Sequence, residues 1–160
     1  MIKVAGYVEM LASNIALALP YFNRSPLEFG WGECEVNDFP SESGVYAILR
    51  RCTIAKEGYR YQGLTPKNPI VLYVGKASSV RTIRRRLRDH FGNREPNFQG
   101  SQFVKFLMQV VQDEEMVKRI LWSPSTIIAC VPVTESDAVI SAVERLAIQI
   151  LEPRFNIKDR

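Results

Sequence analysis

The distribution of hydrophobic residues in the middle of the chain predicts β-strands. Residues 44–51 (GVYAILRR) and residues 70–75 (IVLYVG) are rich in β-branched, aliphatic and tyrosine side chains, and we expect them to form two strands. Apolar residues at adjacent as well as alternate positions are typical of strands that are covered on both faces. Residues 126–133 (TIIACVPV) predict a third strand, and residues 58–62 (GYRYQ) a short additional one.

Apolar residues at three- to four-residue spacing predict helices in the remaining segments. Between residues 80 and 91 they form one stripe, which arginines surround; the stripe consists of Val80, Ile83, Leu87 and Phe91. The other expected helices are residues 7–19, which end at Pro20, residues 100–121, and a C-terminal helix that runs to Leu151 behind the capping and acidic residues 135–137.

The resulting order of elements, β-β-α-α-β-α, predicts a small mixed α/β (α+β) fold. We expect a mainly antiparallel central sheet of three strands, or slightly more, flanked by helices. Residues 1–43 are expected as an N-terminal helix and an irregular arm, and residues 44–160 as the main domain. A length of 160 residues suits a single compact domain overall.

Composition excludes several classes of protein. One histidine and three separated cysteines cannot supply the usual four-ligand zinc site. An odd number of cysteines without a CxxC pair argues against a disulfide framework, so we expect a reducing, cytoplasmic location. No apolar stretch reaches the roughly 20 residues of a membrane helix. The GKASS segment that begins at Gly75 lacks the P-loop arrangement, so we expect no nucleotide cofactor.

Basic residues are concentrated in the middle of the chain. The formal net charge is +4, but residues 44–94 contain twelve Lys or Arg and only two Asp or Glu. The flanking segments 1–43 and 95–160 are both net acidic, and 14 of the 21 basic residues are arginine. Arginine presents a planar fork that matches phosphate oxygens. This distribution favours a nucleic-acid partner over the alternative of a solvated basic helix face.

Several polar side chains on these elements are candidates for chemistry. Tyr46 and Tyr73 lie in the two clearest strands, where both hydroxyls can reach one end of a sheet; the alternative is that they are core residues. Arg86 and His90 are four residues apart on one flank of the basic helix. We expect them at the edge of a cleft, where arginine can hold a phosphoryl group and histidine can move a proton; the alternative is a solvated pair.

Two further candidates complete this set. Glu144 is expected on the border of the buried face of the last helix, where Val139, Val143, Leu146, Ala147 and Ile150 point inward. From there a single carboxylate could hold Mg²⁺ together with water and phosphate oxygens, unless it is an ordinary surface residue. Gly75 and Lys76 directly follow the second strand, so glycine allows close approach to a ligand and lysine adds a cation beside Tyr73.

Together these elements resemble the GIY-YIG nuclease superfamily, over residues 44–156. Gly44-Val45-Tyr46 is similar to the GIY element, and Tyr73-Val74-Gly75-Lys76 to YIG followed by lysine. Residues 84–91 (RRRLRDHF) resemble the arginine helix of the family, and residues 142–156 (AVERLAIQILEPRFN) its terminal helix. Three features are most like the restriction endonuclease branch of this superfamily. They are the long connection of 27 positions from Tyr46 to Tyr73, the arginine–histidine pair and the N-terminal arm.

The resemblance implies a divalent-metal-dependent endodeoxyribonuclease that hydrolyses phosphodiester bonds in double-stranded DNA. It implies that one of the two tyrosines activates water with help from Lys76 or His90, that Arg86 binds the scissile phosphate, and that Arg84 or Arg85 could substitute for it. Glu144 would hold Mg²⁺ or Mn²⁺, and Asn156 would position Glu144 or a phosphate. Gly75 and four arginines are expected to contact DNA: Arg81, Arg84, Arg85 and Arg88.

We therefore expect a sequence-specific restriction enzyme, acting as a homodimer on a palindromic site. Two alternatives stay open at the level of sequence. One is a structure-specific nuclease of DNA repair or of a mobile element, and the other is a non-catalytic nucleic-acid-binding domain.

Overall fold

One antiparallel sheet organises the structure. The computed structural model describes residues 2–21, 39–51, 69–92, 95–123 and 125–156. Four strands pair in the order β1-β4-β2-β3: β1 (Leu19–Pro20), β2 (Gly44–Arg50), β3 (Ile70–Ala77) and β4 (Thr126–Pro132). The expected α/β class and antiparallel sheet are confirmed, with β1 as a short strand that the sequence pattern did not predict. The additional strand predicted at residues 58–62 lies outside the described residues.

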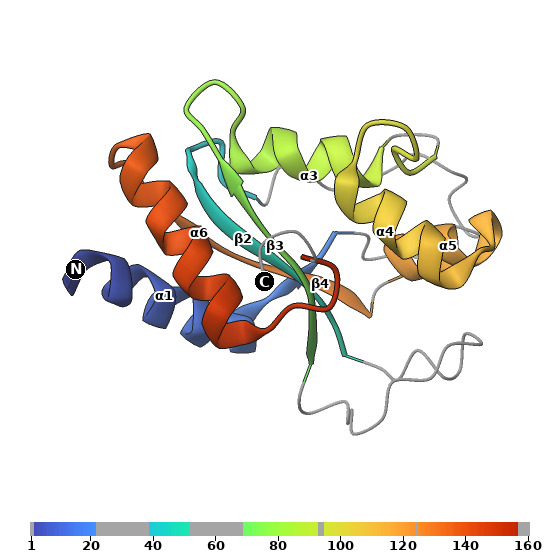
Figure 1. Ribbon diagram of the computed structural model, residues 1–160, viewed down its shortest axis with the longest axis horizontal. Coiled ribbons are helices and arrows are strands. Elements are labelled where there is room, and N and C mark those ends of the chain that lie inside the picture. Colours follow the sequence, from blue (N-terminus) through green and yellow to red (C-terminus); the bar gives the residue numbers. More distant parts are fainter. Residues whose placement is uncertain (1, 22–38, 52–68, 93–94, 124, 157–160) are drawn as a thin grey trace.

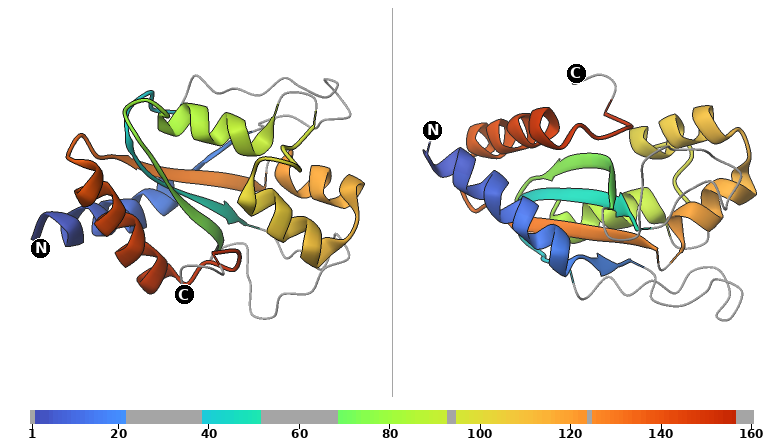
Figure 2. Two further views of the ribbon diagram at one scale, coloured as in Figure 1. Left: turned by 45° about the horizontal axis from the view of Figure 1, so that its top comes forward. Right: turned by 90° about the horizontal axis from the view of Figure 1, so that it is seen from below.

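Helices cover both faces of the sheet (Figures 1 and 2). On one face lie α1 (Ile2–Asn14), which continues as a 3-10 turn (Ile15–Leu17), and α6 (Asp137–Leu151). On the other face lie α3 (Ile83–Phe91), α4 (Gln102–Val111) and α5 (Glu114–Leu121). Among the described residues, no helix is long and apolar enough to cross a membrane.

Each face of the sheet has its own hydrophobic core. Val45, Ala47 and Leu49 of β2 point toward α1 and α6, whereas Tyr46 and Ile48 point toward α3, α4 and α5. All seven residues of β2 are buried, as expected for a central strand that is covered on both sides. The alternation of side chains along β2 therefore determines that Tyr46 faces α3, α4 and α5.

The basic helix begins three residues later than the apolar stripe predicts. Val80 is 81% exposed, and the segment before the helix is a turn in which Ser78 N–H donates to the Arg81 carbonyl. Thr82 is the N-cap, and its side chain accepts a hydrogen bond from Arg85 N–H.

The single long helix predicted at residues 100–121 is wrong. It is two helices, because Gln112 adopts a left-handed conformation (φ 56°) that ends α4. Asp113 then caps α5 by accepting hydrogen bonds from the N–H groups of Glu115 and Met116. The apolar periodicity runs through this break, so the only signal was an Asp followed by acidic residues, a typical helix start.

Two smaller differences concern the helices on the other face. The first helix ends at Asn14, whose side chain donates to the Cys130 carbonyl of β4 at 2.8 Å, rather than at Pro20. In α6 the buried residues include Ile140 and Ile148, while Ile150 is 58% exposed. Most of the predicted irregular arm, residues 22–38, lies outside the described residues.

A buried arginine joins the sheet to the helices of the second face. Arg50, at the end of β2, is fully buried, and its Nη1 donates to the Ile120 carbonyl at 2.9 Å and to Thr126 Oγ1 at 2.8 Å. Thr126 Oγ1 also donates to the Ile120 carbonyl. Because a cation is attracted to the carbonyl end of a helix, Arg50 holds the end of α5 against β2 and β4.

We expect Arg50→Ala to lower the free energy of unfolding by about 3 kcal/mol, because it leaves a buried carbonyl without its charged donor. The matched control is Arg51→Ala, since Arg51 is adjacent and exposed and should change stability by less than about 0.5 kcal/mol. Urea denaturation of both variants measures the difference. Equal effects at the two positions would show that the buried hydrogen bonds of Arg50 contribute nothing.

Candidate active site

The two strand tyrosines lie diagonally on one face of the β2–β3 pair. Tyr46 is the cross-strand partner of Gly75, and Ile48 is the partner of Tyr73. The tyrosine ring centroids are 6.4 Å apart. Tyr46 is fully buried and Tyr73 is half-buried. The structure thus brings the two rings together, with the Tyr46 phenol in the interior.

Gly75 provides the space in which the Tyr46 ring lies. A Cβ atom at residue 75 would stand 2.3 Å from the Tyr46 hydroxyl oxygen and 2.4 Å from its Cζ, far inside van der Waals contact. The absence of a side chain lets the phenol cross β3. The sequence suggested that this glycine allows a ligand to approach, whereas the group that approaches it is a side chain of the same molecule.

His90 lies beneath Tyr46 and not at the edge of a cleft, so that prediction was wrong. It is only 2% exposed, and its Nε2 is 2.6 Å from the Tyr46 hydroxyl. Residues 83, 87 and 90 lie within about 60° of one another around the helix and share its buried face. His90 therefore belongs to the interior side of the helix, although it follows Arg86 by one turn.

The other ring nitrogen of His90 is also occupied. His90 Nδ1 lies 2.6 Å from Ser101 Oγ, and Ser101 is the buried N-cap of α4. The imidazole is packed edge-on against Phe103 at a centroid distance of 5.8 Å and against Tyr73 at 5.4 Å. A buried chain of polar groups, Ser101–His90–Tyr46, therefore runs from α4 through α3 to β2.

Arg86 lies beside the outer end of this chain. Its guanidinium is close enough to the Tyr46 hydroxyl to influence the pKa of that phenol, and among the described residues nothing is hydrogen-bonded to its buried Nε. Burial acts to lower the pKa of Arg86, but the phenols of Tyr46 and Tyr73 and the nearby Asp89 raise it overall. Arg86 is therefore a cation at every relevant pH, with one donor available for a ligand.

Burial keeps both Tyr46 and His90 neutral. It raises the pKa of Tyr46 well above 10, with the Tyr73 phenol adding to the effect and Arg86 opposing it. Burial, together with the positive charges of Arg86 and Arg81, lowers the pKa of His90 to about 3. The carboxylate of Glu144 contributes to the raised pKa of Tyr46, which places α6 within electrostatic reach of the phenol.

Lys76 connects the edge of the sheet to α6. Its Nζ donates to Ser141 Oγ at 2.9 Å and lies 3.6 Å from Glu144 Oε2. The Glu144 side chain is 19% exposed, whereas the adjacent Arg145 is exposed. Glu144 is therefore on the border of the buried face, as its helical position predicted.

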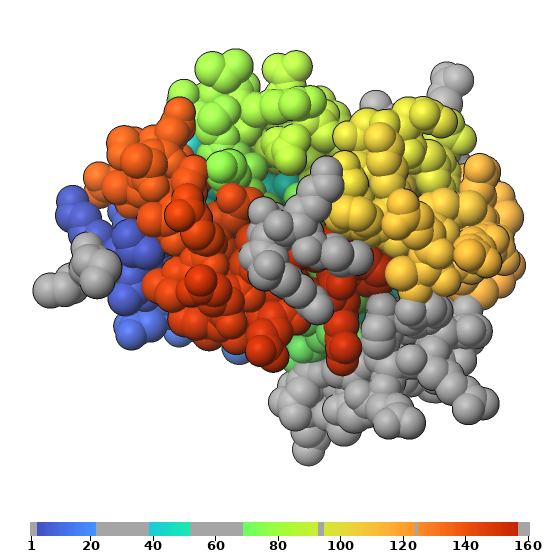
Figure 3. Space-filling model, viewed as in Figure 1, coloured from blue at the N-terminus to red at the C-terminus, as the bar shows by residue number. Residues whose placement is uncertain are grey.

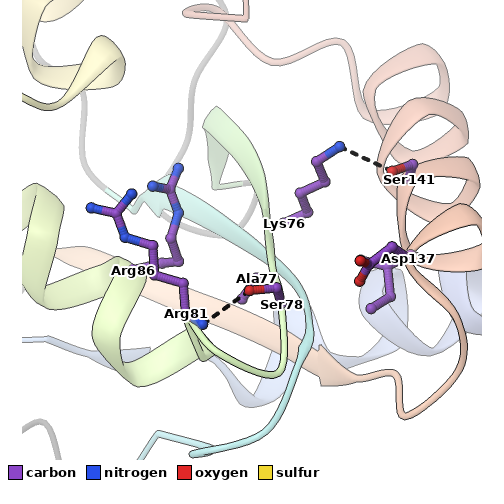
Figure 4. Close-up of a pocket in the computed structure, with 8 residues that line it drawn as sticks. Lys76, Ala77, Ser78, Arg81, Arg86, Asp137 and Ser141 are labelled. Atoms are coloured by element: carbon purple, nitrogen blue, oxygen red, sulfur yellow. Dashed lines mark hydrogen bonds between the residues drawn. The ribbon is translucent and has the colours of Figure 1, made fainter.

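A pocket of about 310 Å³ lies between α3 and α6 at the end of β3. Figure 3 shows these two helices, green and orange-red, next to one another on the same side of the molecule. In Figure 4, Arg81 and Arg86 face the pocket from the α3 side and Lys76 from β3, while Asp137 and Ser141 face it from α6. Two of the three cations also lie near carboxylates, Lys76 near Glu144 and Arg81 near Asp89. Arg86 is therefore the cation best placed to attract an anionic ligand.

The site offers the carboxylate of Glu144 as a ligand for a hard divalent cation. Within the described residues, no group of three or more His, Cys, Asp or Glu side chains could hold a metal. Mg²⁺ needs less, since it is commonly bound through one or two carboxylates together with waters and substrate phosphates. Glu144 can provide one such carboxylate, and Lys76 offsets part of its charge.

The neighbouring arginines have distinct positions. Arg84 Nε donates to the Phe39 carbonyl at 2.9 Å, which attaches α3 to the segment before β2. Arg81 Nε lies 3.1 Å from Asp89 Oδ2. Arg85 and Arg88 are exposed. Of the three consecutive arginines 84–86, Arg86 is the one that lines the pocket.

Asn156 has a different role from the one that the resemblance implied. Its Nδ2 donates to the Val74 carbonyl at 2.7 Å, and its Oδ1 accepts from Val74 N–H at 2.8 Å. Both ends of the buried amide thus pair with the backbone of β3 rather than with Glu144 or a ligand. Asn156 therefore attaches the segment that follows α6 to the edge strand β3.

Sequence reasoning missed Ser101 and the two α6 residues of the pocket, Asp137 and Ser141. The signal for Ser101 was its place before an apolar helix, where serine is a typical cap; its contact with His90 depends on tertiary packing. The α6 residues had a helical signal, because positions 137, 141 and 144 fall on one face.

Comparison of the chain with protein-family models, curated proteins and solved structures found no match.

We expect Gly75→Ala to lower the free energy of unfolding by about 1–3 kcal/mol, because the new methyl group collides with the Tyr46 ring. The matched control is Gly6→Ala in α1, where nothing lies within 4 Å of the added Cβ and helix propensity should make the change neutral or stabilising by up to about 1 kcal/mol. Thermal and urea unfolding compare the two variants. A neutral Gly75→Ala would contradict the close approach of the phenol.

Acid should destabilise the protein through His90. The histidine pKa is about 3 in the fold against an ordinary 6.5, so between these values the unfolded chain binds one more proton. The free energy of unfolding then falls as the pH drops through this window, by at most about 1.4 kcal/mol per pH unit. Urea unfolding should show the stability advantage of wild type over His90→Asn shrinking as the pH falls from about 7 to 4. Parallel pH profiles would contradict the neutral, buried histidine.

Proposed function

We propose that this chain is a divalent-metal-dependent DNA endonuclease of the GIY-YIG type. The observation that carries the proposal is the contact of the Tyr46 hydroxyl with His90 Nε2 at 2.6 Å, next to Arg86 and a cationic pocket. The two tyrosine strands, the arginine helix and the glutamate helix that resemble the family in sequence supply all of these side chains. Cleavage of a phosphodiester bond requires a proton acceptor and positive charge at the phosphate, and this arrangement offers both.

The phosphate is proposed to bind in the pocket between α3 and α6. No described residue pairs with the buried Nε of Arg86, and guanidinium groups bind phosphate through paired N–H donors. Lys76 and Arg81 add two further cations along the same opening. The adjacent phosphates of a nucleic-acid backbone would distribute along this row, while the exposed Arg85 and Arg88 would contact the backbone further along.

Tyr46 is proposed to pass a proton to His90 when it activates the attacking water. A phenol with a raised pKa needs a close acceptor, and the nearest ring nitrogen provides it. Arg86 and Arg81 lower the pKa of His90 in the free protein. A bound phosphate offsets these charges, so His90 becomes a better proton acceptor when substrate is present. Movement of Arg86 onto the phosphate would also free the Tyr46 oxygen.

Mg²⁺ or Mn²⁺, held by Glu144, would supply charge neutralisation at the phosphate and at the leaving oxygen. Lys76 keeps the Glu144 carboxylate in place and partly neutralised before the cation binds. Ser141 fixes the Lys76 ammonium from the same helix. Arg86 and Glu144 thus approach the reacting phosphate from opposite helices.

Double-stranded DNA is the proposed substrate, in keeping with the concentration of arginine between residues 44 and 94. Cutting both strands of a palindrome would require two copies of the chain related by two-fold symmetry. We therefore propose a homodimeric, sequence-specific restriction enzyme, with a cytoplasmic location that rests on cysteine usage alone.

We expect purified protein with Mg²⁺ to convert plasmid DNA into discrete fragments, and chelation with EDTA to stop the reaction. Tyr46→Phe should reduce the cleavage rate by about 100-fold or more, because it removes the transferred proton. Arg86→Ala and Glu144→Gln should reduce it comparably. Agarose gels of a time course measure the rates, and a larger loss in Tyr73→Phe than in Tyr46→Phe would assign water activation to Tyr73.

The matched controls are Tyr7→Phe and Glu115→Gln, which make the same chemical changes at residues that do not line the pocket and should leave cleavage unchanged. Nicking of branched DNA without discrete plasmid fragments would favour a structure-specific nuclease of repair or of a mobile element. A salt-dependent mobility shift of DNA with no cleavage at any metal concentration would favour a non-catalytic binding domain and contradict the proposal.

A further inference from the structure

Ser101 lies where it can determine which nitrogen of His90 carries the proton. As the N-cap of α4, its Oγ accepts a hydrogen bond from Val104 N–H at 3.2 Å. The same oxygen is 2.6 Å from His90 Nδ1. The residue is only 4% exposed, so water cannot readily replace either contact. The cap hydrogen bond therefore fixes the hydroxyl oxygen in front of the imidazole.

The hydrogen-bond partners available to the Tyr46 hydroxyl favour one of the two neutral forms of His90. The nearby Arg86 guanidinium can only donate hydrogen bonds, so it cannot accept the phenol proton. The phenol is fully buried, and a buried hydroxyl proton needs an acceptor inside the protein. His90 Nε2, at 2.6 Å, is that acceptor, which requires Nε2 to carry no proton.

A neutral imidazole with a bare Nε2 carries its hydrogen on Nδ1. That hydrogen then points at Ser101 Oγ, whose two lone pairs can accept from both Val104 N–H and His90 Nδ1–H. The hydroxyl proton left without an acceptor in this chain is then that of Ser101, which keeps 4% exposure, rather than that of the fully buried Tyr46. In the opposite form the serine would donate to Nδ1, and Nε2–H would donate to Tyr46. Nε2 could then take no proton from the phenol. The rings of Phe103 and Tyr73 hold the imidazole plane, so the two forms differ in protonation rather than in ring position.

We propose that Ser101 is a positioning residue that holds His90 in its Nδ1–H form and so keeps Nε2 open to the proton of Tyr46. The catalytic consequence rests on the proposed nuclease function, whereas the protonation of the ring does not. Ser101 itself contacts neither the pocket nor a substrate. It acts through His90, much as a hydrogen-bonding partner on one ring nitrogen sets the role of the other.

The experiment uses the fact that the chain contains a single histidine. A long-range ¹H–¹⁵N correlation spectrum of ¹⁵N-labelled protein at neutral pH therefore reports the protonation of His90 alone. We expect the wild-type pattern of a protonated Nδ1 and a bare Nε2. A wild-type spectrum with the proton on Nε2 would overturn the proposal without any variant.

Two substitutions at residue 101 separate its acceptor role from its capping role. Ser101→Asp retains a capping oxygen and can only accept, so it should preserve the Nδ1–H form and most of the cleavage rate. Ser101→Ala leaves Nδ1–H without an acceptor, so the proton should move to Nε2. Its kcat for plasmid cleavage should then fall about tenfold or more, with KM changed less than about twofold, since proton transfer rather than binding is impaired.

Asp113→Ala is the matched control, because it removes the N-cap of α5 without touching His90. It should leave both the spectrum and the kcat as in wild type. A Ser101→Ala variant that keeps the Nδ1–H form would overturn the inference, as would an Asp113→Ala variant with the same loss of kcat. A wild-type protein that does not cut DNA would instead overturn the proposed function, while the spectra still decide the state of His90.

Discussion

The passage of the Tyr46 ring across Gly75 is the contact on which the rest of the site depends. It allows a side chain of β2 to cross its neighbouring strand and reach His90 on α3. His90 in turn contacts Ser101, whose hydroxyl starts α4. Because residue 75 has no side chain, the Tyr46 ring can cross β3, and hydrogen bonds of 2.6 Å then join β2 to α3 and α3 to α4. A polar chain of this kind is stable in an interior because its members satisfy one another.

The position of β3 at the edge of the sheet explains how side chains from opposite faces meet. A central strand would separate α3 from α6 completely, since helices on the two faces cannot approach across paired strands. At the edge, Lys76 reaches Ser141 on one side, while Tyr46 and Arg86 lie on the other. The pocket forms where the two hydrophobic cores end, and it gathers charges that neither core could hold alone.

Sequence patterns predicted the three main strands and the α6 helix, because each depends on periodicity within one segment. The break at Asp113 was missed since apolar periodicity continues through it. His90 was misplaced because its burial depends on the tertiary contacts of its ring with Tyr46, Ser101 and Phe103, which its position in the helix does not reveal. No local pattern predicts the contact of Ser101 with His90 or that of Asn156 with Val74, because each contact joins elements that are separate in the chain. The nuclease assignment stays a proposal.

The segment after α6 has a consequence for how copies of this chain can associate. Arg154 and Phe155 donate their N–H groups to the carbonyls of Val71 and Leu72, and Asn156 takes both backbone groups of Val74. The outward hydrogen-bonding groups along this stretch of β3 are therefore already paired. A second molecule cannot extend the sheet here without first displacing the C-terminal segment, and with it the end of the helix that bears Glu144. This arrangement protects an edge strand against strand addition. It also directs any symmetric assembly toward contacts between helices and loops.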